Sequence, residues 1–331
     1  MLLLAIESSC DDTAVSVLKD GIPLSNIVSS QMVHSGYGGV VPEMASREHQ
    51  KNIWIVTEKA IQHSGINKKE LDAIAFTKGP GLPGSLMVGA SFAKGLAMAL
   101  DKPLIAVNHM EAHILSLLIK EPMPSFPFLC LVVSGGHTML VLVKQWNEMT
   151  VIGSTKDDAV GEAFDKCAKI MGLGYPGGKI IDDLAKSGNE KAFPFPVAKV
   201  EKYRFSYSGV KTSFLYFLQS KTTEFIRENQ SDICSSLQFA LLKPLVDACE
   251  LAMEEYGIKE LGLAGGVAAN SSLRKRLQAL CDQKEGRVYF PDFEYCTDNA
   301  AMIGRAACFK WEQKDFCGLD ETTEPRLAIG S

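Results

Sequence analysis

The sequence has no uninterrupted apolar segment as long as the roughly 20 residues that a membrane-spanning helix needs. Its first residues, Met1 to Ile6, are apolar, but the chain then reaches the acid Glu7 and has no basic leader. We therefore expect a buried first strand here and neither a signal peptide nor a membrane anchor. A cytoplasmic protein without membrane contact is the expectation.

Close cysteine pairs and an excess of positive charge are also missing. The nine cysteines are scattered from Cys10 to Cys317 with no CxxC pair, which is typical of free thiols in a reducing compartment. The formal net charge is -5, which argues against a large, uniformly basic nucleic-acid surface. It leaves room for a local basic patch or a basic partner.

What remains is the composition of an ordinary soluble globular protein, with 46% hydrophobic and 22% charged residues. At 331 residues the chain exceeds what a single hydrophobic core usually serves. Two lobes are therefore predicted.

Two of the six histidines, His109 and His113, lie four positions apart, and this spacing puts both imidazoles on one face of a helix. One carboxylate from elsewhere would complete a two-histidine, one-carboxylate metal set, and Asp298 is the candidate, although it also looks like the N-cap of a helix from Ala300. An exposed helix with two solvated histidines is an equal alternative. A zinc peptidase is unsupported, because Met110 stands where that motif needs glutamate.

A strand, a polar turn and a second strand occur twice in the chain. The first turn, Glu7 to Thr13, is rich in Ser, Asp and Thr, which can offer hydroxyls and backbone N–H groups to a phosphate. The second turn, Ser134 to Thr138, has two glycines that would let backbone amides approach an anion. Plain hairpins are the alternative, but the repetition favours duplicated lobes.

Several later segments suggest ligand or partner contacts. A helix is predicted to begin at the acids Asp157 and Asp158 and to end at Tyr175 to Gly178, with Asp182 and Asp183 opening the next one. Such acids are more commonly solvated residues at helix ends. The functional alternative is that they bind the ribose hydroxyls of a nucleotide. The small-residue helix Ser85 to Leu100 is either core packing or a partner face.

In the segment Phe193 to Lys211, lysine and arginine residues alternate with aromatic residues. This composition is expected of a surface that meets a nucleic-acid backbone with some stacking, and an ordinary insertion loop is at least as probable. Farther on, the strand Glu260 to Ala264 leads through Gly265 and Gly266 to Asn270. We expect the Asn270 amide to be available to the polar edge of a base or ribose.

Taken together, the motifs resemble, along the whole chain, those of the tRNA threonylcarbamoyladenosine transferases, the TsaD family. The matching stretches are Ile6–Thr13, Tyr37–Glu43, Asn108–His113, Val133–Thr138, Gly161–Lys166, Ala264–Asn270 and Cys296–Asn299. Two departures stand out: Asp12 replaces the usual glutamate, and Pro83 replaces an aliphatic residue. The shorter Asp12 puts a direct catalytic role for that position in doubt, whereas Pro83 is expected only to stiffen its loop.

The resemblance implies an α/β fold of two duplicated ribonuclease-H-like lobes, the ASKHA superfold of actin, sugar kinases and heat-shock chaperones, with ligand between the lobes. We expect residues 1–108 in the first lobe, 109–297 in the second with an insertion near 193–211, and a final helix of about 298–331 returning to the first. The resemblance also implies a metal, iron(II) with zinc or magnesium as alternatives, on His109, His113 and Asp298. The implied adenylate-binding residues are Val132, Val133, Ser134, Gly135, Gly136, Asp165, Gly178, Asp182 and Asn270.

By the same resemblance, the enzyme moves the threonylcarbamoyl group from threonylcarbamoyl-AMP to N6 of the adenosine 3′ of the anticodon, in tRNAs that read A-starting codons. AMP is the other product. Proton removal is assigned to the turn with Asp11 and Asp12. The implied partners are tRNA, a TsaB-like paralogue and a TsaE-like ATPase.

Two other functions fit parts of the sequence. A kinase or ATPase of the same superfold would use the same nucleotide site, and a non-catalytic partner subunit would share the fold. The histidine pair argues against the first, because ATP-dependent relatives hold magnesium through acids and phosphates. His109, His113 and Asp298 together argue against the second, since a scaffold needs no open metal site.

Overall fold

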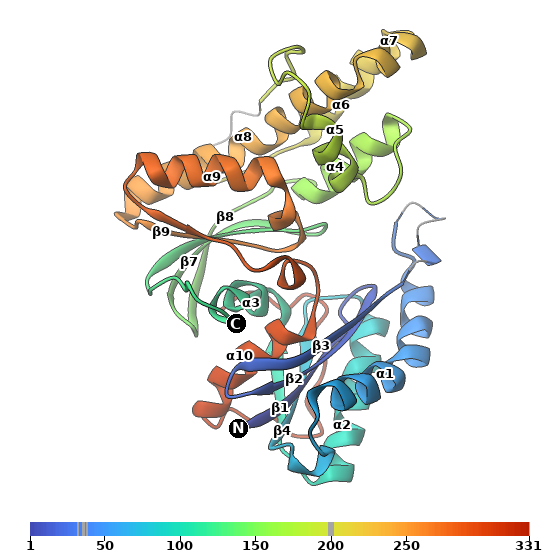
Figure 1. Ribbon diagram of the computed structural model, residues 1–331, viewed down its shortest axis with the longest axis vertical. Coiled ribbons are helices and arrows are strands. Elements are labelled where there is room, and N and C mark those ends of the chain that lie inside the picture. The colour runs from blue at the N-terminus through green and yellow to red at the C-terminus, as the bar shows by residue number, and fades with distance from the viewer. Residues whose placement is uncertain (32, 35–36, 38, 198–201, 331) are drawn as a thin grey trace. The chain divides into compact units, whose positions relative to one another are not determined.

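Figure 1 shows the computed structural model, which describes residues 1–331 except 32, 35–36, 38, 198–201 and 331. The chain divides into unit 1, made of Met1–Met123 and Pro291–Ser331, and unit 2, Pro124–Phe290. The expected first lobe ended at residue 108, whereas unit 1 continues through the histidine helix and regains the chain at Pro291. Gly38 of the Tyr37–Glu43 motif and Lys199 lie outside the described residues.

Unit 1 is built on a five-stranded sheet of order β3-β2-β1-β4-β5. Its strands are β1 (Leu2–Glu7), β2 (Asp12–Lys19), β3 (Ile22–Ser30), β4 (Ala73–Gly79) and β5 (Leu104–Asn108). Strand β2 runs antiparallel to β1 and β3, while β4 and β5 run parallel to β1. The β2–β3 hairpin turns at Asp20 and Gly21, both with positive φ, as the right-handed twist of a two-residue hairpin requires.

Helices cover both faces of this sheet (Figure 1). Helices α1 (Pro42–Ser64) and α2 (Pro83–Leu100) pack on one face, and α10 (Ala300–Glu312) packs against β1 and β2 on the other, beside α3 (His109–Leu115). A Cβ on Gly89 of α2 would lie 2.1 Å from Ser8 Oγ, so glycine lets this helix approach the end of β1. The segment of about 298–331 belongs to unit 1, but its helix α10 ends at Glu312, short of the expected residue 331.

Unit 2 repeats the strand pattern of unit 1. Its sheet has the order β10-β9-β6-β7-β8, with β7 antiparallel to β6 and β8, and with β9 parallel to β6 and β10. The strands are β6 (Phe128–Val133), β7 (Thr138–Gln145), β8 (Glu148–Ser154), β9 (Glu260–Ala264) and β10 (Arg287–Tyr289). Each unit thus has three consecutive antiparallel strands followed by two parallel ones, which confirms the predicted duplication and the α/β class.

Most helices of unit 2 come between β8 and β9 in the sequence. They are α4 (Val160–Ile170), α5 (Gly177–Ala185), α6 (Ser208–Gln219), α7 (Thr223–Glu228), α8 (Gln230–Tyr256) and, after β9, α9 (Ser271–Gln283). Short 3-10 helices occur in both units. They are η2 (Lys68–Glu70), η3 (Ser116–Leu118) and η5 (Phe293–Tyr295) in unit 1 and η4 (Gly266–Ala269) in unit 2.

Two predicted helix boundaries in unit 2 are wrong. Helix α4 begins at Val160, because Asp157 instead accepts hydrogen bonds from the backbone of Tyr207 and the hydroxyl of Ser206. Helix α4 ends at Ile170, and the glycines at 177 and 178 open α5 rather than close α4. Asp182 therefore lies in the second half of α5, not at its start.

The basic and aromatic segment is not the stacking surface that its composition suggested. Phe205 and Tyr207 are fully buried and pack in the core of unit 2. Lys202 pairs with Glu255, and Lys211 pairs with Asp158. Burying a large aromatic ring stabilises the folded state, whereas leaving it exposed does not. The segment is therefore the packed insertion that was the alternative.

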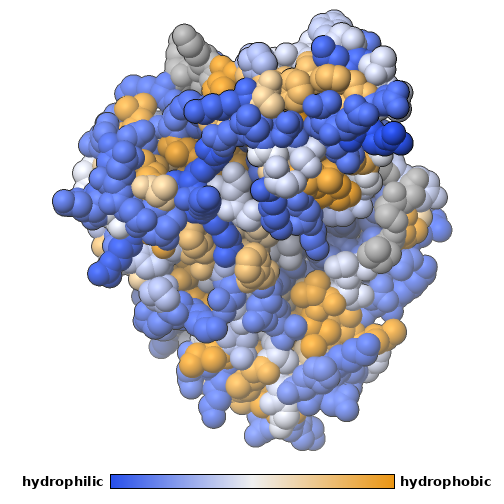
Figure 2. Space-filling view, turned by 45° about the horizontal axis from the view of Figure 1, so that its top comes forward, coloured by the Kyte–Doolittle hydropathy of each residue, from blue (hydrophilic) through white to orange (hydrophobic). Residues whose placement is uncertain are grey.

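No helix within the described part of the chain is both long and apolar enough to cross a membrane. On the face drawn in Figure 2, hydrophobic side chains form separate patches among hydrophilic ones. All nine cysteines are free thiols, as their spacing predicted.

Candidate metal centre and ligand-binding residues

The short helix α3 carries both histidines of the predicted metal site. It begins directly after β5, where the Asn108 side chain accepts hydrogen bonds from the backbone N–H groups of Met110 and Glu111 and so caps the helix. The cap fixes the first turn at the end of the strand. Both imidazoles then lie on the same face, one helical turn apart.

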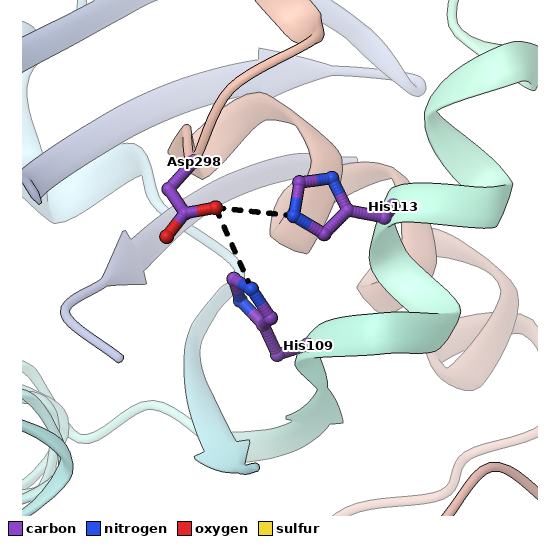
Figure 3. Close-up of side chains that lie close together, drawn as sticks. All are labelled: His109, His113 and Asp298. Atoms are coloured by element: carbon purple, nitrogen blue, oxygen red, sulfur yellow. Dashed lines mark hydrogen bonds and ion pairs between the residues drawn. The ribbon is translucent and has the colours of Figure 1, made fainter. Parts of the chain in front are cut away.

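The third residue comes from the segment just before α10. Asn299, and not Asp298, is the N-cap of this helix, since its side chain accepts from the backbone N–H of Met302 at 3.0 Å. The alternative of Asp298 as a cap is therefore wrong. Its carboxylate points instead toward the two imidazoles, as Figure 3 shows.

The three side chains converge on one oxygen atom (Figure 3). Asp298 Oδ1 lies 3.1 Å from His113 Nε2 and 3.5 Å from His109 Nε2. The two rings meet edge to face, with centroids 4.7 Å apart. The imidazoles are 7% and 0% exposed, so the alternative of two solvated histidines is wrong.

The arrangement fits a divalent cation. One nitrogen from each imidazole and one carboxylate oxygen all lie within 4.8 Å of one another. Ligand atoms bound at about 2.1 Å to a tetrahedral or octahedral ion lie about 3.0–3.4 Å apart, close to the two nitrogen–oxygen distances here. Two imidazoles with one carboxylate leave further coordination positions open, as catalytic sites do.

A buried carboxylate lies behind the first imidazole. Glu7, the last residue of β1, has no exposed surface and accepts a hydrogen bond from His109 Nδ1 at 3.0 Å. Burial by itself lowers the pKa of His109, but the charges of Glu7 and Asp298 outweigh it and raise this pKa to about 9. A metal ion must therefore displace a proton from this imidazole.

The turn after β1 is held in place by two helices. The carbonyl of Cys10 accepts hydrogen bonds from His49 Nε2 on α1 and from Ser85 Oγ on α2, each at 3.0 Å. Thr13 Oγ1 lies 2.8 Å from the other ring nitrogen of His49. These contacts fix the backbone on both sides of Asp11 and Asp12.

Asp12 has the electrostatic surroundings of a proton acceptor. Burial raises its pKa most, the nearby charges of Asp298, Asp11 and Glu7 raise it further, and a hydrogen bond with Ser30 opposes them, which gives about 7. A carboxyl group with this pKa exchanges protons near neutral pH. The predicted catalytic role of Asp11 and Asp12 stays a prediction.

In unit 2, the glycine turn follows the buried strand β6. Val132 and Val133 are fully buried within that strand, so their side chains offer no surface to a ligand. Ser134 closes the turn, because its hydroxyl oxygen accepts a hydrogen bond from the backbone N–H of His137. Gly135 and Gly136 are exposed, and a Cβ on either would meet nothing within 4 Å, which leaves open space above their backbone.

The other predicted ligand-binding residues are engaged with helix ends. Asp165 accepts from the backbone N–H of Gly177 at 2.7 Å and so anchors the start of α5 near Gly178. Asp182 accepts from the backbone and the hydroxyl of Ser271 at the start of α9. Their binding of a nucleotide stays a prediction.

Asn270 is also engaged within the protein. Its side-chain oxygen accepts from Leu273 N and caps α9, and its amide nitrogen donates to Gln238. The side chain is 8% exposed. Capping thus uses the oxygen and Gln238 uses one N–H of the amide, while the predicted contact of Asn270 with a ligand stays a prediction.

Comparison with known proteins assigns the chain to a family. A family model described as TsaD, tRNA N6-adenosine threonylcarbamoyltransferase, matches residues 23–305. The chain belongs to the TsaD family. It is therefore a transferase, as the motifs predicted.

Curated TsaD relatives match over nearly the whole chain. The tRNA N6-adenosine threonylcarbamoyltransferase of Cytophaga hutchinsonii is 53% identical, over 99% of this chain and 96% of that protein. The protein of the same name from Christiangramia forsetii is 54% identical, over 98% and 97%. That of Porphyromonas gingivalis is 50% identical, over 99% of both chains.

Solved structures of other proteins share the TsaD fold at low sequence identity. Full-length HypF, in a phosphate- and nucleotide-bound form, has a TM-score of 0.63 at 14% identity, covering 95% of this chain and 46% of HypF. The ROK hexokinase of Thermus thermophilus has a TM-score of 0.50 at 15% identity, covering 95% and 100%. These similarities support the duplicated, ASKHA-like fold and carry no statement about activity.

Sequence reasoning missed the residues that support the TsaD site. Glu7 was assigned only to a polar turn, although a charged residue at the end of an otherwise apolar strand is a signal of a buried functional carboxylate. His49 and Ser85 gave no such signal. Their role depends on the packing of α1 and α2 against the turn, which no local motif encodes.

Proposed function

We propose that the protein transfers the threonylcarbamoyl group of threonylcarbamoyl-AMP to N6 of the adenosine 3′ of the anticodon, in tRNAs that read A-starting codons. The observation that carries this proposal is the match at 53% identity, over 99% of the chain, to a tRNA N6-adenosine threonylcarbamoyltransferase. The buried site of His109, His113 and Asp298 supports it, because the reaction benefits from a Lewis acid.

The bonds of this reaction balance without a further reagent. The N6 amine attacks the carbonyl carbon of the mixed anhydride, a carbon–nitrogen bond forms, and the bond from that carbon to the phosphate oxygen breaks. AMP leaves with the electron pair, and the amine loses one proton. We assign that proton to Asp12, whose pKa of about 7 suits an acceptor, with Asp11 beside it.

His109, His113 and Asp298 would hold the metal. Two imidazoles and one carboxylate suit iron(II) or zinc better than magnesium, which prefers oxygen ligands and water. When bound, such an ion polarises an oxygen of the activated carbonyl or phosphate. The protein's part is to keep three donors converged and shielded from bulk water.

Unit 2 would bind the adenylate part of the donor. The exposed amides of Gly135 and Gly136 can approach an anionic oxygen, since no side chain covers them. We further propose that Asp165 and Asp182 lie near the ribose, with Asn270 ordering the start of α9. The proposal includes a cytoplasmic location, which the free thiols and the proposed tRNA substrate support.

A single-turnover assay tests this function. Threonylcarbamoyl-AMP labelled in the threonyl group is mixed with unmodified tRNA and the purified protein, with and without a TsaB-like paralogue and a TsaE-like ATPase. Label in the adenosine beside the anticodon, lost after chelation, supports both the reaction and the metal. Hydrolysis of added ATP by the purified protein alone, without transfer under any condition, would favour an ATPase of the same superfold instead.

A partner surface is expected on α1 and α2. Met87 and Met98 are 62% and 66% exposed and lie about three turns apart on α2, so they share one side of the helix. Trp54 of α1 is also exposed, and its ring lies 6.4 Å from that of Phe92 on α2. We assign this surface to the TsaB-like paralogue, because exposed methionine and tryptophan suit the centre of a protein interface.

Changing Met87 and Met98 together to lysine is expected to weaken binding of the paralogue by about 10-fold or more, since each charge would lose water at the interface. The affinity is measured by biolayer interferometry with purified partners. Tyr216→Lys is the matched control, because Tyr216 is equally exposed but lies on α6 of unit 2. Equal loss of binding in the control would contradict the assignment.

A further inference from the structure

Glu7 is a buried carboxylate beside the candidate metal centre to which the proposed transfer reaction assigns no role. We propose that Glu7 is a positioning residue that keeps a proton of His109 on Nδ1, so that Nε2 is the nitrogen whose lone pair binds the metal ion. This inference rests on the proposed metal site and names a residue on which that site depends.

The carboxylate of Glu7 has hydrogen-bonding neighbours on both oxygens. Its Oε2 accepts from Thr77 Oγ1 at 2.6 Å and lies 3.0 Å from His109 Nδ1, and its Oε1 accepts from the backbone N–H of Ser9. The residue has no exposed surface. A buried carboxylate is tolerated when hydrogen-bond donors surround it, and those donors identify it as the ionised, acceptor-only form.

An acceptor-only neighbour decides which nitrogen of the imidazole carries a proton. Because Glu7 can only accept, Nδ1 of His109 must be the donor. The neutral ring then has its lone pair on Nε2, the atom that lies 3.5 Å from Asp298 Oδ1. Ser9 Oγ lies 3.3 Å from the same Nδ1, but a hydroxyl can donate as well as accept and so does not fix the tautomer.

The second histidine lacks such a neighbour. His113 Nδ1 is buried and has no hydrogen-bond partner among the described residues. The two imidazoles therefore differ: the protein presets the tautomer of His109, whereas that of His113 depends on what its Nε2 meets. A carboxylate behind a metal-binding imidazole typically contributes 10- to 100-fold to metal affinity.

Glutamine at this position provides a sharp test, because it keeps the shape and changes one acceptor into a donor. The backbone N–H of Ser9 needs an acceptor, so the amide oxygen is held there and the NH2 group faces His109 Nδ1. Thr77 can accommodate this change by rotating its hydroxyl, which also lies 3.4 Å from the carbonyl of Ile6. The ring must then accept at Nδ1 and carry its proton on Nε2, where a metal would bind.

The experiment measures zinc affinity by competition with a chromophoric chelator. Glu7→Gln is expected to lower zinc affinity about 10- to 100-fold. Glu111→Gln is the matched control and should bind as the unmodified protein does. Glu111 lies on the same helix as the histidines, and its Oε1 accepts from the backbone N–H of Gly330, outside the metal set.

Three further readouts separate this inference from a general loss of structure. Glu7→Asp keeps the charge but withdraws it from the imidazole, and should lower affinity even if Glu7→Gln folds poorly. In a His109→Ala background, Glu7→Gln should have no additional effect on zinc affinity. In the zinc-loaded unmodified protein, nitrogen-15 NMR should show the proton of His109 on Nδ1.

The outcomes distinguish the two proposals. Zinc binding by Glu7→Gln within about 2-fold of the unmodified protein, or a proton on Nε2 of His109, would overturn the role of Glu7 and leave the metal site standing. Failure of the unmodified protein to bind zinc or iron(II) would overturn both.

Discussion

Replacing His113 or His109 by alanine is expected to lower metal affinity so far that the purified protein carries little metal, and to lower transfer to tRNA by about 10³-fold or more. Loss of a Lewis acid removes several kcal/mol of transition-state stabilisation, and each 1.4 kcal/mol corresponds to about a factor of 10 in rate. Metal content is measured by mass spectrometry and transfer by the single-turnover assay.

The two alanine variants should differ in stability. Alanine is the best helix former, so α3 itself should persist in both. His113→Ala removes a ring whose Nδ1 has no partner among the described residues, whereas His109→Ala leaves Glu7 buried without one of its donors. We expect the second to cost about 1–3 kcal/mol more in free energy of unfolding, as measured by urea titration.

His63→Ala is the control, because His63 is an exposed histidine near the end of α1 and lies in no cluster of metal-binding groups that the described residues form. It should keep both metal and activity. Full transfer activity in metal-free protein, or in either of the α3 variants, would contradict the role given to this site.

The histidine pair of the candidate metal site could be predicted from sequence because its spacing is a local pattern. The spacing of His109 and His113 alone puts them on one face of a helix. Asp298 was expected to cap the helix from Ala300, but Asn299 is its N-cap. The side chain of Asn299 also donates to the carbonyls of Tyr295 and Thr297. These bonds hold the Asn299 side chain at the start of the helix, one residue after Asp298.

Residues with two possible uses could not be resolved from sequence. Asp165, Asp182 and Asn270 suit a ribose or a base as well as they suit a helix end, and the structure shows all three bonded to backbone N–H groups. The buried aromatics Phe205 and Tyr207 were ambiguous in the same way. Composition tells which contacts a side chain can make, while burial decides which it makes.

The duplicated fold, in contrast, followed from patterns that recur. Each unit needs a buried strand, a small-residue turn and a second strand before its parallel strands, and these signals are present near Leu2 and again near Phe128. The boundary between the units was less visible, because α3 packs against α10, which lies far away in sequence. Such long-range packing leaves no mark in local periodicity.

Asp12→Asn is expected to lower the rate of transfer by about 10²- to 10⁴-fold, the usual contribution of a general base. The carboxyl group must be ionised to accept a proton from the attacking amine. With a pKa of about 7, the rate should rise about 10-fold per pH unit below 7 and level off above it. Asp12→Asn should lose this rise, whereas Asp11→Asn should retain it, as measured by single-turnover transfer across pH.

Stability gives an independent check with the opposite sign. The pKa of Asp12 is raised in the folded protein above its ordinary value of 3.8, so the folded state holds this proton more tightly than the unfolded chain does. Its contribution to stability is fully present below pH 3.8 and is lost as pH rises through about 7. In metal-free protein above pH 7, Asp12→Asn should therefore be more stable than the unmodified protein, since the asparagine carries no charge to bury. A variant that is slower yet more stable has lost a proton acceptor, whereas one that is slower and less stable has lost its structure.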